Sequence, residues 1–289
     1  MRTIPERPVS RGSLWFGLLT AGAIAFGGEP EGRAPRIQPA TPVLPANFLK
    51  FYLHFPEPME RGEVFAHCRL LRLDDGGGEV EVEDPFREVE LWDESFTRLT
   101  LWFHPGRQKP GLNLNVDFGT VLEPGKRYRL EIDPAWRTES GHPIGEGWSK
   151  TFTASAMDET QPSPAKWRIA WSAELGGPVL IADETLDPSS LAKFLRIRRA
   201  GPEETTSEPA SAAWLASESG GARYRLAWPD MGVGAFELIV DPRVEDLAGN
   251  SPARPFNLDL EKRPNSRERT EPIVIGFELP ETATATARE

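Results

Sequence analysis

Four histidines and one cysteine are the residues of this chain whose side chains most readily support metal binding or nucleophilic chemistry. His54, His67, His104 and His142 include no pair at the spacing of zinc ligands, and no HExxH motif occurs. Cys68 is the single cysteine, so no intrachain disulfide can form, and we expect a buried, unreactive thiol. No G-x-S-x-G, P-loop or G-x-G-x-x-G motif occurs either. The sequence therefore predicts no catalytic residue, no metal ligand and no cofactor.

Carboxylates are plentiful, because the chain contains 44 Asp and Glu. The pairs Asp74/Asp75 and Glu245/Asp246 could offer oxygen ligands to Ca²⁺, but acidic turn residues are common in an acidic chain. Two carboxylates of a glycosidase-type hydrolase could also be present, although nothing in the sequence marks the pair. We expect a protein without catalytic activity and keep a hydrolase with a cryptic carboxylate pair as an alternative.

One cationic segment is the best candidate for binding. His104, Arg107 and Lys109 fall in residues 104–121, and Trp102 lies on the strand that leads into them. A cationic loop beside an aromatic ring could bind an acidic glycan or a peptide carboxylate. A purely structural loop that covers an open sheet edge is the simpler reading.

The elements around these residues follow a repeated pattern. Residues 128–136 alternate apolar and polar side chains and end in an Asp-Pro stop, and residues 236–244 do the same 108 positions later. Each copy leads through a Gly-centred turn to a strand that ends near Phe152 or Leu260. Tyr128 follows a Pro-Gly turn, which suits a tyrosine corner whose hydroxyl bonds back to the main chain. The sequence thus predicts an all-β protein of two related domains.

Other local signals complete the expected elements. Asp187-Pro188 should cap a short helix over 189–194. Residues 273–279 alternate like one more strand, either an edge strand added to the second domain or a strand offered to a partner. A second pair of matching segments, 56–59 and 183–186, is offset by 127, so the first domain carries an insertion of about 19 residues, for which 104–121 is the candidate.

The motif from Leu122 to Leu130, L-x-P-G-x-x-Y-x-L, and the turn Glu245–Asn250 resemble bacterial Ig-like domains of the SbsA type. The opening segment Asn47–Met59 is similar to the first strand of that family. The resemblance covers residues 42–157 well and 163–262 less well. It implies two tandem Ig-like β-sandwiches and a spacing, adhesive or carbohydrate-associated role, and it assigns no role to Arg107 or Lys109.

The N-terminus predicts export. Three arginines precede an apolar run over 14–26, and Ala23-Ile-Ala25 supplies a cleavage pattern, so the mature chain should begin near Phe26. The run is too short to span a membrane, and a formal net charge of −11 disfavours nucleic acid and anionic membranes as partners. We predict a periplasmic, cell-surface or secreted bacterial protein.

The expected organisation has six segments. They are a signal peptide (1–25), a linker (26–41), an Ig-like domain (42–157), a linker (158–166), a second Ig-like domain (167–262) and a linker with a C-terminal strand (263–289). The expected function is a spacing or protein-contact module of the bacterial envelope, with an envelope protein or a glycan as possible partner. A carbohydrate-binding protein that uses 104–121 is the first alternative.

Overall fold

The structure is a computed structural model, and it describes residues 36–108, 119–145, 148–201, 207–218, 221–227, 233–257 and 270–279. The predicted signal peptide lies outside these ranges. Residues 34–289 form one compact unit, in which strands dominate and helices are short, so the all-β prediction is confirmed. No helix within the described ranges is both long and apolar enough to cross a membrane.

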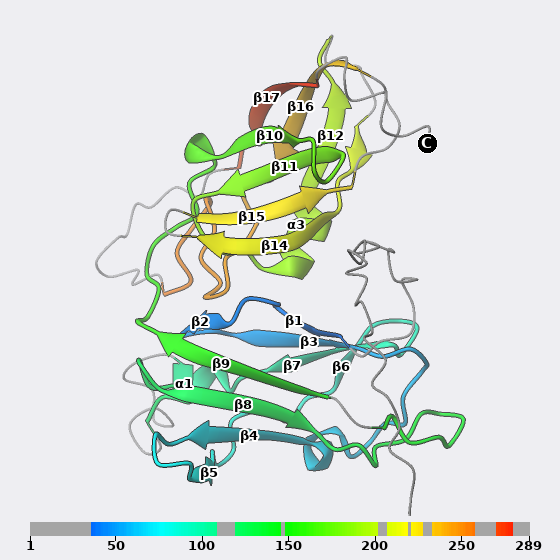
Figure 1. Cartoon of the computed structure of the whole chain (residues 1–289), viewed down its shortest axis with the longest axis vertical. Helices are drawn as coiled ribbons and strands as arrows, with labels where there is room; N and C mark the ends of the chain where they lie inside the picture. Colours follow the sequence, from blue (N-terminus) through cyan, green and yellow to red (C-terminus); the bar gives the residue numbers. More distant parts are fainter. Residues whose placement is uncertain are drawn as a thin grey trace, which may run out of the picture. The chain divides into compact units, whose positions relative to one another are not determined.

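Two sheets enclose the first hydrophobic core, and we call residues 36–157 the first sandwich (Figure 1). One sheet has the order β1-β3-β7-β6, made of β1 (Arg36–Gln38), β3 (Lys50–His54), β7 (Arg98–Trp102) and β6 (Leu91–Trp92). The other has the order β2-β9-β8-β4-β5, made of β2 (Val43–Pro45), β9 (Ser149–Ser155), β8 (Arg127–Ile132), β4 (Cys68–Leu73) and β5 (Glu79–Glu81). Because β1 pairs with β3, the sheet begins before residue 42, and the predicted linker 26–41 extends too far.

A second pair of sheets encloses a separate core, and we call residues 164–279 the second sandwich. One sheet has the order β10-β11-β15-β14, made of β10 (Arg168–Ser172), β11 (Gly177–Ala182), β15 (Gly221–Leu226) and β14 (Ala212–Glu218). The other has the order β13-β12-β16-β17, made of β13 (Glu208–Pro209), β12 (Leu195–Arg199), β16 (Gly234–Val240) and β17 (Ile273–Leu279).

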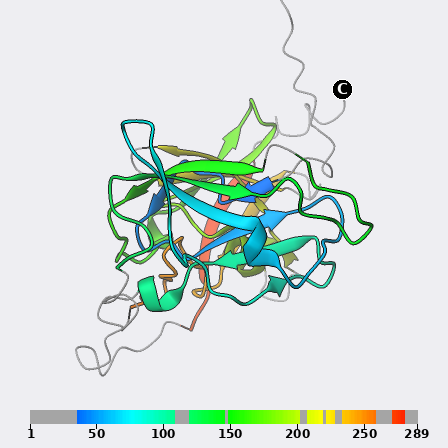
Figure 2. The ribbon, with the colours of Figure 1, turned by 90° about the horizontal axis from the view of Figure 1, so that it is seen from below.

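The helices are single turns or little more. The first sandwich has the 3₁₀ turn η1 (Val64–His67) and the α-helical turn α1 (Pro105–Gln108), which Figure 2 shows as a teal coil at the lower left. The second has η2 (Pro164–Lys166) and α3 (Pro188–Phe194). The carboxylate of Asp187 accepts a hydrogen bond from the main-chain nitrogen of Ser190, so the predicted capped helix is confirmed.

Alternation of apolar and polar residues explains the cores. Along β8, Tyr128, Leu130 and Ile132 are buried while the residues between them face outward. The Tyr128 hydroxyl accepts a hydrogen bond of 2.8 Å from the main-chain nitrogen of Glu123, as expected for a tyrosine corner. Phe236 cannot make this bond, and in the second sandwich Tyr224 on β15 accepts instead from the main-chain nitrogen of Leu186 at 2.6 Å.

The strand pairing of the first sandwich recurs in the second. Tyr128 on β8 pairs with Phe152 on β9, and Phe236 on β16 pairs with Phe277 on β17. The strand expected near Leu260 lies outside the described residues, so that prediction stays untested. What the structure does show is that β17 lies beside β16 as β9 lies beside β8. The C-terminal strand therefore pairs within its own chain and lies at the edge of its sheet, as expected for an edge strand of the second domain.

Candidate functional site

A network of partly buried hydrogen bonds lies where the linker after β9 meets both sandwiches. Asn47, which precedes β3, donates its side-chain amide to the carbonyl of Asp158 at 2.8 Å and accepts from the Asp158 nitrogen at 2.8 Å. Asn250, in the loop after β16, also donates to the Asp158 carbonyl, at 3.2 Å. Both asparagines are buried. One linker residue is thus bonded to both sandwiches, and we call this region the joint.

Apolar contacts close the same region. Leu247, in the loop after β16, belongs by its contacts to the core of the first sandwich. Its carbonyl accepts a hydrogen bond of 3.2 Å from the nitrogen of Leu49. Gly249 has a φ of +83°, and a Cβ atom there would lie 2.6 Å from the Cδ1 of Leu49. The turn that the sequence places at Gly249 therefore serves both its own loop and a close approach to the first sandwich.

A buried hydrogen bond between side chains forms the polar part of the joint. The Tyr52 hydroxyl on β3 donates to both carboxylate oxygens of Asp187 at 2.9 Å. Lys50 lies 3.8 Å from Asp187 and 3.1 Å from Glu245. Burial raises the pKa of the Asp187 carboxyl, and the Lys50 charge and the donated hydrogen bonds oppose that rise. This carboxylate caps α3 and at the same time binds the other sandwich.

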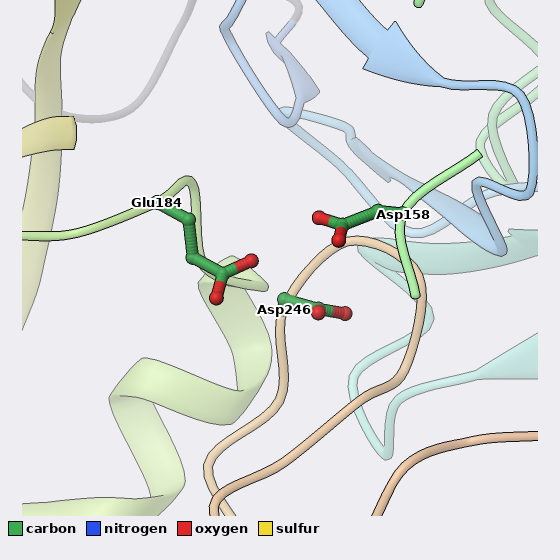
Figure 3. Close-up of side chains that lie close together, drawn as sticks. All are labelled: Asp158, Glu184 and Asp246. Atoms are coloured by element: carbon green, nitrogen blue, oxygen red, sulfur yellow. The ribbon is translucent and has the colours of Figure 1, made fainter. Parts of the chain in front are cut away.

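Three carboxyl groups meet on the linker side of the joint, and we call them the carboxyl cluster (Figure 3). Asp158 comes from the linker, Glu184 from the segment between β11 and α3, and Asp246 from the loop after β16, and one oxygen of each lies within 4.8 Å of the others. Asp246 is 2% exposed and accepts hydrogen bonds from the main-chain nitrogens of Ala248 and Asn250. The Oε2 atom of Glu184 is buried and has no hydrogen-bond donor within the described part of the chain.

The electrostatics of the cluster follow from this crowding. Burial, and then the charges of Asp246 and Asp158, raise the pKa of Glu184 to about 9. Burial is also the main cause that raises the pKa of Asp246 to about 7, and the hydrogen bond from Asn250 opposes it. Acidic groups alone do not define a metal site. The two residues of the predicted pair Glu245/Asp246 also have different partners, because Asp246 lies in the carboxyl cluster and Glu245 forms an ion pair with Lys50.

Sequence reasoning missed this cluster apart from Asp246. Asp158 was assigned to a polar linker and Glu184 to a segment equivalent to Pro56–Met59, and the acidic pairs Asp158-Glu159 and Asp183-Glu184 were not singled out. The three residues come together only through long-range folding. The other predicted acidic pair also lies apart from the cluster, because Asp74 is 3.7 Å from Arg72 in the turn after β4.

The residues predicted to bind a ligand are placed differently. Arg107 on α1 is 6% exposed, and its guanidinium donates to the carbonyl oxygens of Glu83 and Gly119 among others. His104 accepts a hydrogen bond from the nitrogen of Gly106, and Trp102 is half-buried with Lys50 and Arg87 each 6.0 Å from its ring. Lys109 and residues up to 118 lie outside the described residues. The Arg107 charge is thus used to hold the ends of the insertion together.

Cys68 and His67 of the first sandwich are both enclosed or bonded by neighbouring residues. Cys68 is 5% exposed, and burial raises the pKa of its thiol, so the expectation of a buried cysteine is confirmed. His67 lines a groove of roughly 600 Å³ and lies 3.2 Å from the carboxylate of Asp133. Its ring stacks on Trp136, 5.2 Å between centroids, and Trp136 is buried in the core of the first sandwich.

Comparison with known proteins adds little to this geometry. No protein-family model and no curated protein sequence matches the chain. Among solved structures, the chain is similar to a pullulanase from Anoxybacillus sp. LM18-11 at 13% identity and a TM-score of 0.17, over 67% of this chain. The chain spans 22% of the length of that pullulanase. A similarity this low carries no argument about fold or function.

Proposed function

We propose that this chain is an exported bacterial spacer: two tandem Ig-like sandwiches, without catalytic activity, that hold a fixed distance in the envelope or the extracellular space. The joint carries this proposal. A spacer must resist bending, and two sandwiches on a free linker would move independently. Here the linker residue Asp158, the apolar side chain of Leu247 and the buried Tyr52–Asp187 hydrogen bond each tie one sandwich to the other.

Features of the strands support the Ig-like assignment within the proposal. β2 runs parallel to β9 beside an otherwise antiparallel sheet. The tyrosine corner follows Pro124-Gly125 as in the SbsA-type motif, and the pairing of β4, β8 and β9 recurs as β12, β16 and β17. The export signal remains the prediction made from residues 1–25.

Spin-label distance measurements test rigidity. Val80 on β5 and Val274 on β17 are 46% and 49% exposed, so Val80→Cys with Val274→Cys places one label on each sandwich without disturbing a core. The buried Cys68 should react slowly. We expect one narrow distance distribution, and we expect it to broaden when Tyr52→Phe is added. A broad distribution in the unaltered joint would describe a hinged chain and would contradict the proposal.

Export is tested separately by expressing the full chain in a bacterial host. We expect a processed form outside the cytoplasm whose N-terminus lies near residue 26. Full-length protein retained in the cytoplasm would contradict this part of the proposal.

The carbohydrate alternative depends on Arg107 and Lys109, and the internal bonds of Arg107 weaken it. A glycan array tests this alternative. It would be supported if the unaltered chain bound a glycan and a folded Arg107→Ala variant did not. The hydrolase alternative now has a specific carboxyl cluster, but Asp246 is too enclosed to contact a substrate as the cluster stands. For this reason we propose a structural role for the cluster.

A further inference from the structure

The carboxyl cluster has an excess of acceptors over donors. Glu184 faces Asp158, Asp246 and Asp183, and the ammonium group of Lys166 is 3.6 Å from the carboxylate of Asp183. Asp183 also accepts from the indole of Trp167 at 2.7 Å, so its charge is satisfied. Two carboxylates at such short range cannot both remain ionised without a proton or a cation between them.

Protonation of Glu184 resolves this excess. As a carboxylate, Glu184 has an Oε2 atom that is buried and receives no hydrogen bond from any residue that the structure describes. As a carboxylic acid, it can donate to the carboxylate of Asp158, which lies within hydrogen-bonding range. Asp158 is well placed to accept, because hydrogen bonds from the nitrogen and hydroxyl of Thr160 to its Oδ1 hold the side chain in position. Asp246 is held as an acceptor by Asn250.

We propose that Glu184 is a neutral carboxylic acid in the folded protein at neutral pH, and that its proton, shared with Asp158, fastens the linker to the second sandwich. The main chain of the same Asp158 is bonded to Asn47 and Asn250. Loss of the proton therefore places like charges at the residue that connects both sandwiches, and the joint loosens. The chain would then be stiff at neutral pH and more flexible in alkaline surroundings. This regulation of the joint rests on the proposed spacer function.

The sign of the pH dependence follows from linkage. The pKa of Glu184 is raised from 4.5 to about 9, so the stabilisation is complete below about 4.5 and is lost as the pH rises through about 9. Asp246, with its pKa raised to about 7, acts in the same direction. Lys150 acts in the opposite direction, because burial lowers its pKa to about 8 and stability rises as the lysine loses its charge. We call the proton shared by Glu184 and Asp158 the latch. Because Lys150 and Asp246 also change the pH dependence of stability, only a comparison with a Glu184 variant isolates the contribution of the latch.

The test compares the mature chain with Glu184→Gln, which keeps a donor but cannot ionise. Glu174→Gln, at an exposed glutamate in the β10–β11 turn, is the matched control. Melting temperatures are measured from pH 5 to 10 after treatment with EDTA. We expect the melting temperature of the wild type to fall relative to Glu184→Gln as the pH rises from 7 to 10, and Glu174→Gln to follow the wild type. Infrared spectra should contain a carboxylic-acid carbonyl band at pH 7 that Glu184→Gln lacks.

A second variant guards against a misfolded first one. Asp158→Asn removes a like charge and offers an amide donor, so the infrared band of Glu184 should disappear at a lower pH than in the wild type. Parallel melting curves for wild type and Glu184→Gln, or no carboxylic-acid band at pH 7, would overturn the proposal. So would a rise in melting temperature on adding Ca²⁺ that occurs in the wild type and not in Glu184→Gln, because a cation would then be what neutralises the cluster.

The two proposals fail in different ways. A narrow spin-label distance distribution at pH 7 without the carboxylic-acid infrared band would support the spacer function and contradict the proposed protonation of Glu184. A broad distance distribution with the infrared band present would contradict the spacer function. It would also show that the proton shared by Glu184 and Asp158 does not hold the joint rigid.

Discussion

Asp187 shows how one side chain can belong to two levels of structure. Its Asp-Pro sequence is a local helix-start signal, and the carboxylate does accept from the nitrogen of Ser190. The same oxygens accept from Tyr52, which is 135 residues earlier in the chain. The cap is readable from the sequence because its partners are adjacent, and the second contact is not. Asp187 thus stabilises its own helix and also bonds the second sandwich to the first.

Tyr52→Phe should lower the free energy of unfolding by about 1–3 kcal/mol, because it leaves a buried carboxylate short of a donor. Urea unfolding at pH 7 measures the change. Tyr128→Phe is the control: it removes a hydroxyl that bonds within the first sandwich, so it should reduce stability without changing the spin-label distance. A Tyr52→Phe protein as stable as the wild type would show that Lys50 alone compensates Asp187.

At the scale of elements, the repeated turns provide a matched pair of sites. Gly141 and Gly249 have φ values of +85° and +83°, but a Cβ on Gly141 would meet nothing within 4 Å while one on Gly249 would meet Leu49 and Phe256. Gly141→Ala should cost roughly 1–2 kcal/mol from the left-handed backbone alone. Gly249→Ala should cost about 1–3 kcal/mol more, since overpacking is added. Thermal unfolding measures both, and equal costs would show that the two sandwiches can separate slightly at no expense.

β17 provides a second pair of sites, on opposite faces of one strand. Leu279 is 5% exposed and Val274 is 49% exposed. Because β17 occupies the place that β9 has in the first sandwich, Leu279→Ala should lower stability by about 2–5 kcal/mol. Val274→Ala should change it by no more than about 0.5 kcal/mol. Chemical denaturation followed by circular dichroism distinguishes them, and a neutral Leu279→Ala would mean that β17 is dispensable.

For the whole molecule, the joint predicts cooperative unfolding. Leu247 comes from the second sandwich and contributes to the first core, so the first core is incomplete when the second sandwich unfolds. Calorimetry at pH 7 should therefore show one transition whose calorimetric and van't Hoff enthalpies agree. Leu247→Ala should separate it into two transitions. Two transitions in the wild type would indicate sandwiches that fold independently.

The local features of the chain were predictable from sequence, and the insertion shows where prediction ended. Alternation fixed the buried face of β8, the Pro-Gly turn led to the tyrosine corner, and Asp-Pro led to α3, since each depends on neighbours within a few residues. The cationic loop was the best candidate for a ligand site because Arg, Lys and His cluster there, although a structural loop over a sheet edge was the simpler interpretation. Its Arg107 instead donates to carbonyl groups around Glu83 and Gly119, and no local pattern reveals such partners.

The sequence by itself determined an all-β chain, its recurring strands and turns, and its capped helix, because strand alternation and turn chemistry are short-range. Tertiary structure decided that β17 pairs with β16, that Arg107 faces inward, and that Asp158, Glu184 and Asp246 meet at the joint. These outcomes depend on which distant segments share a core. The free energy of burying carboxyl groups together exists only once that core has formed.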